Sequence, residues 1–527
     1  MGNAEFQIVN KDVIVIGAGC AGLTAALEAR RQNAQVLLLD KGPIGIGTNS
    51  VLSNGFFAGP TADYSVDDYV RDTLQTGKAI NYESMVSLVA REAPSAFLFL
   101  RSLGIDLAEV RGGYRVKSPR PDYSPGLVLV QALMKGIKKL SGIDLLPGFY
   151  VIEILKDDEK VYGVRGIDKS GREVSIYAPA IVLATGGAGA IYLRNDNQKC
   201  IMGQGYYLAA KAGLRLWDME FVQFYPFVIA EPGLPSLLLY PPYPKQVLLI
   251  NSAGEDIVKK YGINLQEVIS TKRDEFSAIL FRENIKGPVY MDYRKVPPGL
   301  WERTPLNLLR KVKFDFQRKP IAVAPAAHFF MGGVRINENG QTSLSGLFAC
   351  GEVVWGFHGA NRMSGNALTE CVVFGRIAGR SAAQYALTHR VRPLNRRSSK
   401  SSHRLVSTKG ALRELKRQIK HIAWQYAGVV RREEELKNGL TKIMDLERQL
   451  NGTVVQTVAD RKLKEDLMGA AFVLKAVFTA SLSRKESRGS FIREDFPQKD
   501  DINWRKNSCL AYDWEEGKFS VSYRAVP

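Results

Sequence analysis

Three glycines near the start of the chain, Gly17, Gly19 and Gly22, have a spacing that suits phosphate binding. The β-branched run at 12–16 precedes them and predicts a buried parallel strand, and the Ala- and Leu-rich run at 23–30 predicts a helix. In this setting Gly17 permits a tight turn, Gly19 lets the backbone approach a pyrophosphate, and Gly22 lets the helix pack on the strand. The helix N-terminus also offers N–H groups to phosphate. The motif predicts a dinucleotide site, the alternative being a glycine-rich turn without a ligand.

A second apolar run, at 36–39, ends in Asp40, and an acid at this place accepts hydrogen bonds from an adenosine ribose. A strand followed by glycines recurs twice, at 180–189 and at 346–352. Three separate segments that return to one nucleotide favour a long, folded-in cofactor such as FAD over NAD.

Several longer motifs follow one another in a fixed order. They occupy residues 217–223, 328–333, 346–352, 359–366, 373–379, 486–489, 493–497 and 500–504. Together they resemble the succinate dehydrogenase and fumarate reductase flavoprotein family, to which L-aspartate oxidases and adenylylsulfate reductase flavoproteins are related. The match runs from residue 12 to about residue 506, and the intact Gly-Ala-Asn-Arg segment at 359–362 favours the fumarate reductase side.

The resemblance implies an α/β fold with a Rossmann-like FAD-binding domain, an inserted α+β capping domain and a C-terminal helical domain. The expected boundaries are 1–223 and 345–390 for the FAD-binding domain, 224–344 for the capping domain, 391–407 for a basic linker, 408–485 for the helical domain and 486–527 for a C-terminal extension. The residues themselves also predict the helices, because Leu412, Leu415, Ile419 and Ile422 recur at helical spacing.

The family moves a hydride between flavin N5 and a carbon next to a carboxylate or another electron-withdrawing group. By resemblance, Arg362 and His328 hold the substrate carboxylate, and a guanidinium fork suits a bidentate carboxylate. Arg273 matches the arginine credited with proton transfer, which requires reprotonation through a relay because its pKa is so high. The alternative for these three residues is structural ion pairing or a satisfied core histidine.

The resemblance and the glycine motifs together give a set of expected FAD contacts. They are Gly17, Gly19, Gly22, Asp40, Lys41, Asn49, Ser50, Asn54, Gly55, Thr185, Gly186, Asp218, Glu352, Arg362, Asn366 and Leu368. Complex II enzymes attach FAD through a histidine near residues 47–55, and this chain has no histidine there, so we expect noncovalent FAD.

The chain departs from the family where a second carboxylate would be held. The usual His-Pro-Thr reads Tyr225-Pro226-Phe227, the capping segment reads Tyr240–Lys245, and the proton-relay segment 254–257 lacks its arginine. Burying an unpaired carboxylate is costly. We therefore expect a larger, partly apolar or aromatic substrate with one carboxylate, contacted by Tyr225 and Tyr240. The alternative is that these aromatic residues only pack the capping domain.

The net charge of +19, from 72 Lys and Arg against 53 Asp and Glu, indicates an acidic partner such as nucleic acid, an anionic membrane surface or an acidic protein subunit. The five cysteines are dispersed without a C-x-x-C pair, which argues against a disulfide framework, a metal site or an intrinsic iron–sulfur cluster. We expect a cytoplasmic protein without a transmembrane segment, attached to a membrane only through a partner.

Four functions are consistent with these features. The first is a fumarate reductase type enzyme that exchanges electrons with an iron–sulfur subunit or another redox protein. The others are an oxygen-using oxidase like L-aspartate oxidase, a basic flavoprotein that binds nucleic acid, and a flavin-bearing subunit with a degenerate site. Because tRNA-modifying flavoproteins lack the motifs around His328 and Arg362, we expect no nucleic-acid partner.

Overall fold

A five-stranded parallel sheet supports the N-terminal half of the molecule. Its strand order is β17-β10-β1-β2-β6. The strands are β1 (Val13–Ile16), β2 (Val36–Asp40), β6 (Ile143–Pro147), β10 (Ala180–Leu183) and β17 (Leu347–Ala349). The computed structural model describes residues 11–120, 123–303, 306–389 and 410–526, so the expected basic linker at 391–407 lies outside the described residues. Because β1, β10 and β17 are parallel neighbours, the three glycine-containing segments that follow them meet at one edge of the sheet.

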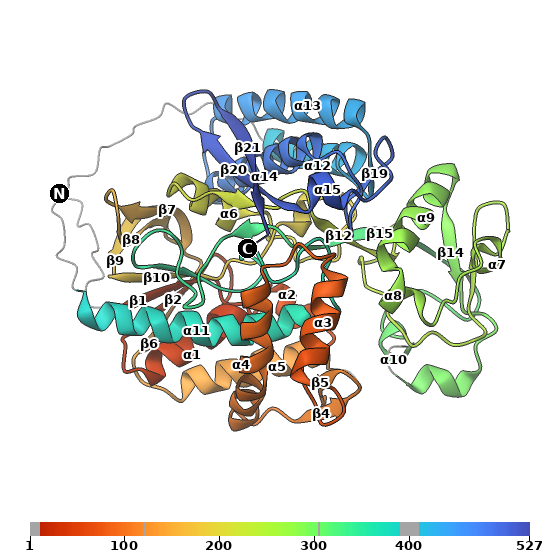
Figure 1. Cartoon of the computed structure of the whole chain (residues 1–527), viewed down its shortest axis with the longest axis horizontal. Coiled ribbons are helices and arrows are strands. Elements are labelled where there is room, and N and C mark those ends of the chain that lie inside the picture. The colour runs from red at the N-terminus through yellow and green to blue at the C-terminus, as the bar shows by residue number, and fades with distance from the viewer. Residues whose placement is uncertain (1–10, 121–122, 304–305, 390–409, 527) are drawn as a thin grey trace.

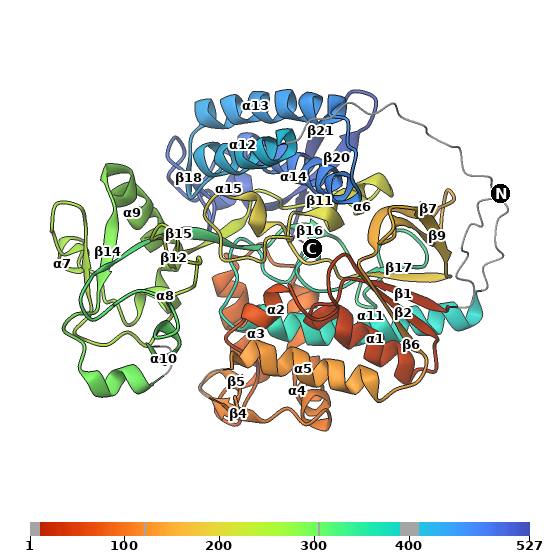
Figure 2. The same ribbon diagram turned by 180° about the vertical axis from the view of Figure 1, so that it is seen from behind.

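Helices cover one face of this sheet, and a small three-stranded sheet covers the other (Figures 1 and 2). The helices are α1 (Cys20–Arg31), α5 (Pro125–Lys138) and α11 (Asn366–Thr388), and the small sheet is β7 (Tyr150–Lys156), β8 (Val161–Ile167) and β9 (Glu173–Tyr177). Helix α11 can pack closely on α1 because Gly379 has no side chain. A Cβ atom at this position would come within 2.3 Å of the carbonyl oxygen of Ala25. Alanine at position 379 would force the two helices apart.

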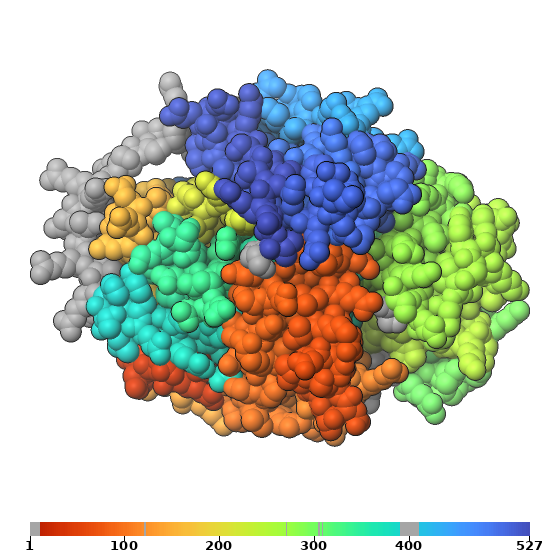
Figure 3. Space-filling view, viewed as in Figure 1, coloured from red at the N-terminus to blue at the C-terminus, as the bar shows by residue number. Residues whose placement is uncertain are grey.

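The capping unit is an antiparallel sheet with its own apolar core. Its strand order is β12-β15-β14-β13. The strands are β12 (Val222–Ile229), β13 (Leu248–Ile250), β14 (Val289–Asp292) and β15 (Ile321–Phe330), and its helices are α7 (Ile257–Lys260), α8 (Val268–Thr271), α9 (Arg273–Lys286), η2 (Pro298–Glu302) and α10 (Leu306–Leu309). The core contains residues from Tyr225 to Ala326. The unit forms a lobe that lies against both the N-terminal and the C-terminal parts of the chain (Figure 3).

The structure corrects the expected end of the capping domain. Residues 331–344 do not join the capping core, because Val334 and Ile336 belong to the large core around the parallel sheet. Strand β16 (Gly333–Val334) pairs with β11 (Leu216–Trp217), outside the capping sheet. The capping unit therefore connects to the rest of the molecule through the paired strands β12 and β15.

The predicted C-terminal helices are α12 (Ala411–Tyr426), α13 (Glu433–Gly452) and α14 (Val458–Ser483), with the apolar stripe of α12 buried as its spacing predicts. Their buried residues belong to the same large core as the parallel sheet. By length and composition α14 could cross a membrane, although the sequence has no continuous run of 18 apolar residues. In its most apolar stretch of 18 residues, 72% is buried inside the protein. Helix α14 packs on α13 and α6 (Gln204–Lys211), as a core helix does.

The remaining elements complete the surface around these units. They are α2 (Asn49–Leu52), β3 (Phe56–Ala58), α3 (Val66–Thr76), α4 (Glu83–Ser102), β4 (Leu107–Val110), β5 (Gly113–Val116), η1 (Gly189–Ile191), β18 (Val430–Arg431), β19 (Ile492–Arg493), α15 (Asp501–Trp504), β20 (Lys506–Asp513) and β21 (Lys518–Ala525). The β20–β21 hairpin continues the sheet of β11 and β16, so the C-terminal segment is part of the fold.

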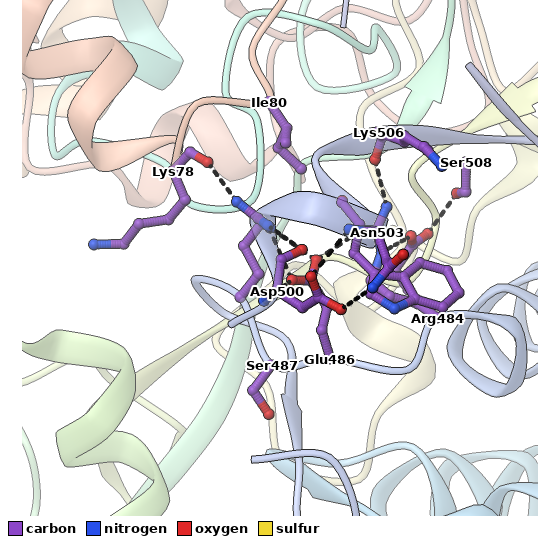
Figure 4. Close-up of polar contacts among 12 residues, drawn as sticks. Lys78, Ile80, Arg484, Glu486, Ser487, Asp500, Asn503, Lys506 and Ser508 are labelled. Atoms are coloured by element: carbon purple, nitrogen blue, oxygen red, sulfur yellow. Dashed lines mark hydrogen bonds and ion pairs between the residues drawn. The ribbon is translucent and has the colours of Figure 1, made fainter. Parts of the chain in front are cut away.

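A fully buried ion network ties this C-terminal segment to the rest of the molecule (Figure 4). Arg484 contacts Glu220 at 2.7 Å and Glu486 at 2.9 Å, and all three side chains have no exposed area. Arg488 contacts Glu486 at 2.8 Å and donates to the carbonyl oxygen of Lys78 at 3.0 Å. Glu220 lies two residues before β12, so the network also fixes the start of the connection to the capping unit.

Replacing Arg484 with Met should destabilise the protein strongly, because two buried carboxylates lose their shared cation. We expect the free energy of unfolding to fall by about 3 to 5 kcal/mol. The matched control is Arg417→Met, which breaks the exposed pair of Arg417 with Glu414 and should leave the free energy of unfolding almost unchanged. Urea unfolding followed by tryptophan fluorescence measures the free energy of unfolding of both variants. Equal effects of the two substitutions would contradict the stabilising role of the buried Arg484 network.

Candidate active site

A cavity of about 650 Å³ lies between the edge of the parallel sheet and the capping unit. Its floor is formed by the β1–α1 turn, by the residues that follow β10 and β17, and by the start of α11. Its other side is formed by the capping unit, including the segment 236–244. The cavity is thus long, and it is made of segments far apart in the sequence.

Most of the expected cofactor contacts line this cavity. They are Gly17, Gly19, Asp40, Lys41, Asn49, Ser50, Asn54, Thr185, Gly186, Glu352, Arg362 and Leu368. Gly17 has a φ of +105°, and a Cβ atom there would come within 2.3 Å of the carbonyl oxygen of Ala184. Only glycine allows β1 and β10 to come this close at the turn.

Three expected cofactor residues support the cavity without lining it. Gly22 packs α1 on the β1 turn, since its Cβ would meet the Gly17 oxygen at 1.9 Å, and Gly55 has a positive φ of +66° against Pro125. Asn366 is fully buried, and its amide oxygen accepts a 2.9 Å hydrogen bond from the Tyr69 hydroxyl. This bond ties the start of α11 to α3.

Asp218 is not among the residues that line the cavity, and its expected contact with FAD stays a prediction. Its carboxylate accepts hydrogen bonds from the backbone N–H of Ser508, the amide of Asn507 and the indole of Trp355, at 2.6 to 2.7 Å. Burial raises the pKa of Asp218 to about 7, with the nearby charge of Glu220 acting in the same direction. The family motif at 217–223 marks Asp218, but the side chain serves to hold the C-terminal hairpin.

The ribose end of the cavity is organised by Asp40. Its carboxylate accepts from the N–H groups of Ala18 at 2.9 Å and Gly42 at 2.7 Å, and burial raises its pKa. The hydroxyl of Ser50 accepts from the N–H of Cys20 at 2.9 Å, which places it at the start of α1. The glycine turn, the helix end and the acid therefore meet as a dinucleotide requires.

Unpartnered polar atoms test whether such a ligand fits. The buried hydroxyls of Thr48 and Thr185 both belong to residues that line the cavity, and neither finds a hydrogen-bond partner among the described residues. Glu352 is half-buried beside Gly187, accepts from the N–H of Phe330 at 3.1 Å, and has its pKa raised to about 7 by burial. A polar ligand that spans the cavity would satisfy these groups, so the residues fit a bound FAD.

Two buried arginines form what we call the cation end of the cavity, together with His328. Arg273 donates to the carbonyl oxygen of Arg362 at 2.6 Å, and Arg362 donates to the side-chain oxygen of Gln223 at 2.9 Å. Within the described part of the chain neither arginine forms an ion pair, and the Nε atoms of both lack a partner. Burial and the charge of Arg273 lower the pKa of Arg362 to about 9. Such an arrangement binds an anion.

His328 is held by an acid that the sequence motifs did not reveal. Its Nδ1 lies 2.6 Å from the carboxylate of Asp196, which also lines the cavity. With Nδ1–H donating to the carboxylate, Nε2 remains for a ligand. The only available signal in the sequence is that Asp196 is the one acid between residues 189 and 203.

Two amide side chains orient the arginines and were also missed. Gln223 donates to the side-chain oxygen of Asn361 at 2.8 Å, and Arg273 donates to the same oxygen at 3.1 Å. Asn361 in turn donates to Asp274, which is half-buried beside Arg273 and has its pKa raised by that burial. Gln223 and Asn361 belong to the motifs at 217–223 and 359–366. Their positions in these motifs do not indicate that their side chains hold the two arginines by hydrogen bonds.

Both expected aromatic contacts, Tyr225 and Tyr240, line the cavity from the capping side. The ring of Tyr225 lies 5.7 Å from that of His328. The segment at 254–257 is elsewhere, because Glu255 is exposed and pairs with Lys260 at 2.6 Å. The cavity therefore receives no relay group from that segment.

Family models match two long parts of the chain. The model described as "FAD binding domain" matches residues 12–368, and the model described as "Fumarate reductase flavoprotein C-term" matches residues 416–527.

Curated relatives match nearly the full length. The chain is 32% identical to an uncharacterised FAD-dependent oxidoreductase of Methanocaldococcus jannaschii, covering 95% of this chain and 96% of the relative. It is 31% identical to one subunit of the fumarate reductase (CoM/CoB) of Methanothermobacter marburgensis, covering 96% and 98%. It is 30% identical to the L-aspartate oxidase of Agrobacterium fabrum, covering 96% and 95%. A solved E. coli quinol fumarate reductase chain superposes with a TM-score of 0.85 at 26% identity, covering 99% and 97%.

The flavin should leave the protein completely when it is denatured with acid. The cavity segment 47–54 presents hydroxyl, amide and aliphatic side chains, and none of these attaches to a flavin ring. Cys200 lies nearby, with its Sγ 3.2 Å from the Gly47 oxygen, but burial raises the pKa of its thiol and keeps it protonated. We expect all yellow colour in the supernatant for both the native chain and Cys200→Ala. Colour retained in the native pellet and released in Cys200→Ala would identify a covalent bond instead.

Proposed function

We propose that this chain, which belongs to the fumarate reductase and succinate dehydrogenase flavoprotein family, oxidises or reduces a carboxylate-bearing substrate at the cation end of its cavity. The family models, which match most of the chain, confirm the expected FAD-dependent oxidoreductase. The observation that carries the proposal is the pair of buried arginines, neither of which forms an ion pair with a described residue. When bound, FAD supplies the N5 position that gives or takes the hydride.

Arg362 and His328 hold the substrate carboxylate in this proposal. The Nε of Arg362 has no partner among the described residues, and His328, whose Nδ1 faces Asp196, donates Nε2–H to the carboxylate when its ring carries both protons. The positive charge of Arg362 next to the bound carboxylate withdraws electrons from the adjacent carbons of the substrate. A carbon–carbon double bond at these carbons is then easier to reduce. Binding by these two groups also fixes the orientation of the reacting carbons.

Arg273 moves the proton that accompanies the hydride. It is 7% exposed, lies next to Arg362 and has an unpartnered Nε. Asp274, half-buried and with its pKa raised by that burial, is the adjacent carboxyl that can return a proton to Arg273. Asp274 replaces the expected relay at 254–257, which lies away from the cavity.

Substituting Arg273 with Ala should abolish turnover and leave FAD bound. We expect the rate at which the reduced enzyme is reoxidised by crotonate, followed anaerobically by stopped-flow absorbance, to fall by about 10² to 10⁴-fold. Arg282→Ala, an exposed position on the same helix, is the control and should behave like the native chain. Native-like reoxidation in Arg273→Ala would remove Arg273 from the mechanism.

We further propose that electrons are exchanged with a separate redox protein. The related chain of M. marburgensis is named as one subunit of a fumarate reductase, which supports a multi-subunit arrangement here. An iron–sulfur protein is the partner that the resemblance implies, and attachment to a membrane would then depend on such a partner.

A cluster of basic side chains beside the cavity supports an acidic partner. We call it the basic cluster, and it consists of Lys199, Lys416 and Lys420. Lys199 lies between the cavity-lining residues Asn197 and Cys200, and the neighbouring loop contacts α12, where the N–H of Leu193 donates to the Lys420 oxygen at 3.1 Å. Burial and the like charges of Lys416 and Lys199 lower the pKa of Lys420 to about 8. An acidic surface docked here would relieve that repulsion.

Reversing charge in the basic cluster should slow electron transfer from an acidic redox protein. We expect Lys199→Glu/Lys416→Glu to slow reduction of the bound FAD by a reduced bacterial ferredoxin at least about 10-fold at low salt, with a weaker effect at high salt. Lys259→Glu, an exposed position in the capping unit, is the control.

An unchanged rate in the double variant would contradict docking at the basic cluster. Rapid reoxidation of the reduced protein by air alone would favour the second candidate, an oxidase, which the 30% identity to an L-aspartate oxidase supports.

A further inference from the structure

We propose, on the basis of the proposed function, that the substrate carries one carboxylate and that its other end is a bulky apolar or aromatic group. A small dicarboxylate would then be a poor ligand. The proposal rests on what surrounds the cavity beyond its cation end. There the lining consists mainly of apolar and aromatic side chains of the capping unit.

The cavity reaches into the apolar core of the capping unit. We call this part the apolar wall, and it is lined by Tyr225, Leu239, Tyr243, Ile269, Tyr293, Leu306 and Leu309. All of them belong to the capping core or pack against it. An apolar group placed against this wall loses contact with water on most of its surface, at a gain of roughly 25 cal/mol per Å².

Two tyrosine hydroxyls of the apolar wall are already engaged. Tyr243 donates to the Leu239 oxygen at 2.7 Å. Tyr293 contacts the sulfur of Met291 at 2.8 Å. A second carboxylate in this region would meet no free donor from Tyr243 or Tyr293, and burial without a partner is costly.

The other cations that line the cavity do not replace a second carboxylate holder. Lys41 is paired with Asp466 at 2.7 Å on the ribose side. Arg115 lies on the exposed face of β5, 5.5 Å from the ring of Phe56 and near Tyr240. A cation exposed to water holds an anion weakly. The strong anion site is thus the cation end, and it suits one carboxylate.

Ligand binding to the FAD-loaded protein tests the substrate class. The probes are crotonate, with one carboxylate and a methyl group, trans-cinnamate, with a phenyl group in its place, and fumarate, with a second carboxylate. We expect cinnamate to bind at least roughly 10-fold tighter than crotonate, and fumarate to bind more weakly than crotonate, in isothermal titration calorimetry. Fumarate as the tightest ligand, or cinnamate no tighter than crotonate, would overturn the proposal.

Variants of the apolar wall test whether this wall is where the phenyl group of cinnamate binds. We expect Ile269→Ser, and the milder Leu309→Ala, to weaken cinnamate several-fold and to leave crotonate unchanged. Ile285→Ser, at a site on α9 that is 71% exposed, is the matched control. Equal loss of both ligands in Ile269→Ser and Leu309→Ala would argue against the apolar wall as the binding region.

Arg362→Gln separates this inference from the proposed function. If Arg362→Gln weakens all three ligands and fumarate is still the tightest in the native protein, the proposed function stands and the inference on substrate class fails. If Arg362→Gln changes none of them, the carboxylate site itself is misplaced and the proposed function fails.

Discussion

Two arginines, Arg273 and Arg362, lie buried next to each other, and neither forms an ion pair with a carboxylate in the part of the chain that the structure describes. Holding like charges together away from water requires a rigid frame of neutral hydrogen-bonding groups, which Gln223, Asn361 and the carbonyl oxygen of Arg362 provide. An anionic ligand relieves this unfavourable arrangement, so the same electrostatic cost that strains the free protein favours substrate binding. The surrounding fold can be understood as the means of keeping these groups in place.

The frame depends on segments from every part of the chain. Arg273 begins a helix of the capping unit, Arg362 precedes α11, and Gln223 lies at the start of β12. The buried network around Arg484 and Glu220 fixes the backbone just before β12 and is completed by the C-terminal segment. The C-terminal segment thus stabilises the site without touching it, which explains why the family motif at 486–489 is needed far from the cavity.

Much of the architecture could be predicted from the sequence, because it depends on local patterns. The β-branched run at 12–16, the three glycines and Asp40 are close together in the chain, and each needs only its neighbours to adopt its structure. The periodic apolar residues of α12 likewise predicted a helix and its buried face. The hydrogen bonds of Asp218 to the C-terminal hairpin could not be predicted, because a motif gives the identity of a residue but not the direction of its side chain. Asp196 was missed because its partner, His328, is 132 residues away.

By itself, the sequence determined the parallel sheet with its glycine turns, the position of the nucleotide at their edge, and the residue types that can bind an anion. Only the tertiary structure decided which charges have partners and which do not. Lys41 is neutralised by Asp466, whereas Arg273 and Arg362 have no such partner in the described chain, and no spacing along the sequence distinguishes these cases. Similarly, the tyrosines of the capping unit could have offered free hydroxyls, but in the fold Tyr243 donates to the Leu239 oxygen and Tyr293 contacts the sulfur of Met291. The physical reason is that pairing and burial arise from contacts between residues distant in the chain, and these exist only once the chain has folded.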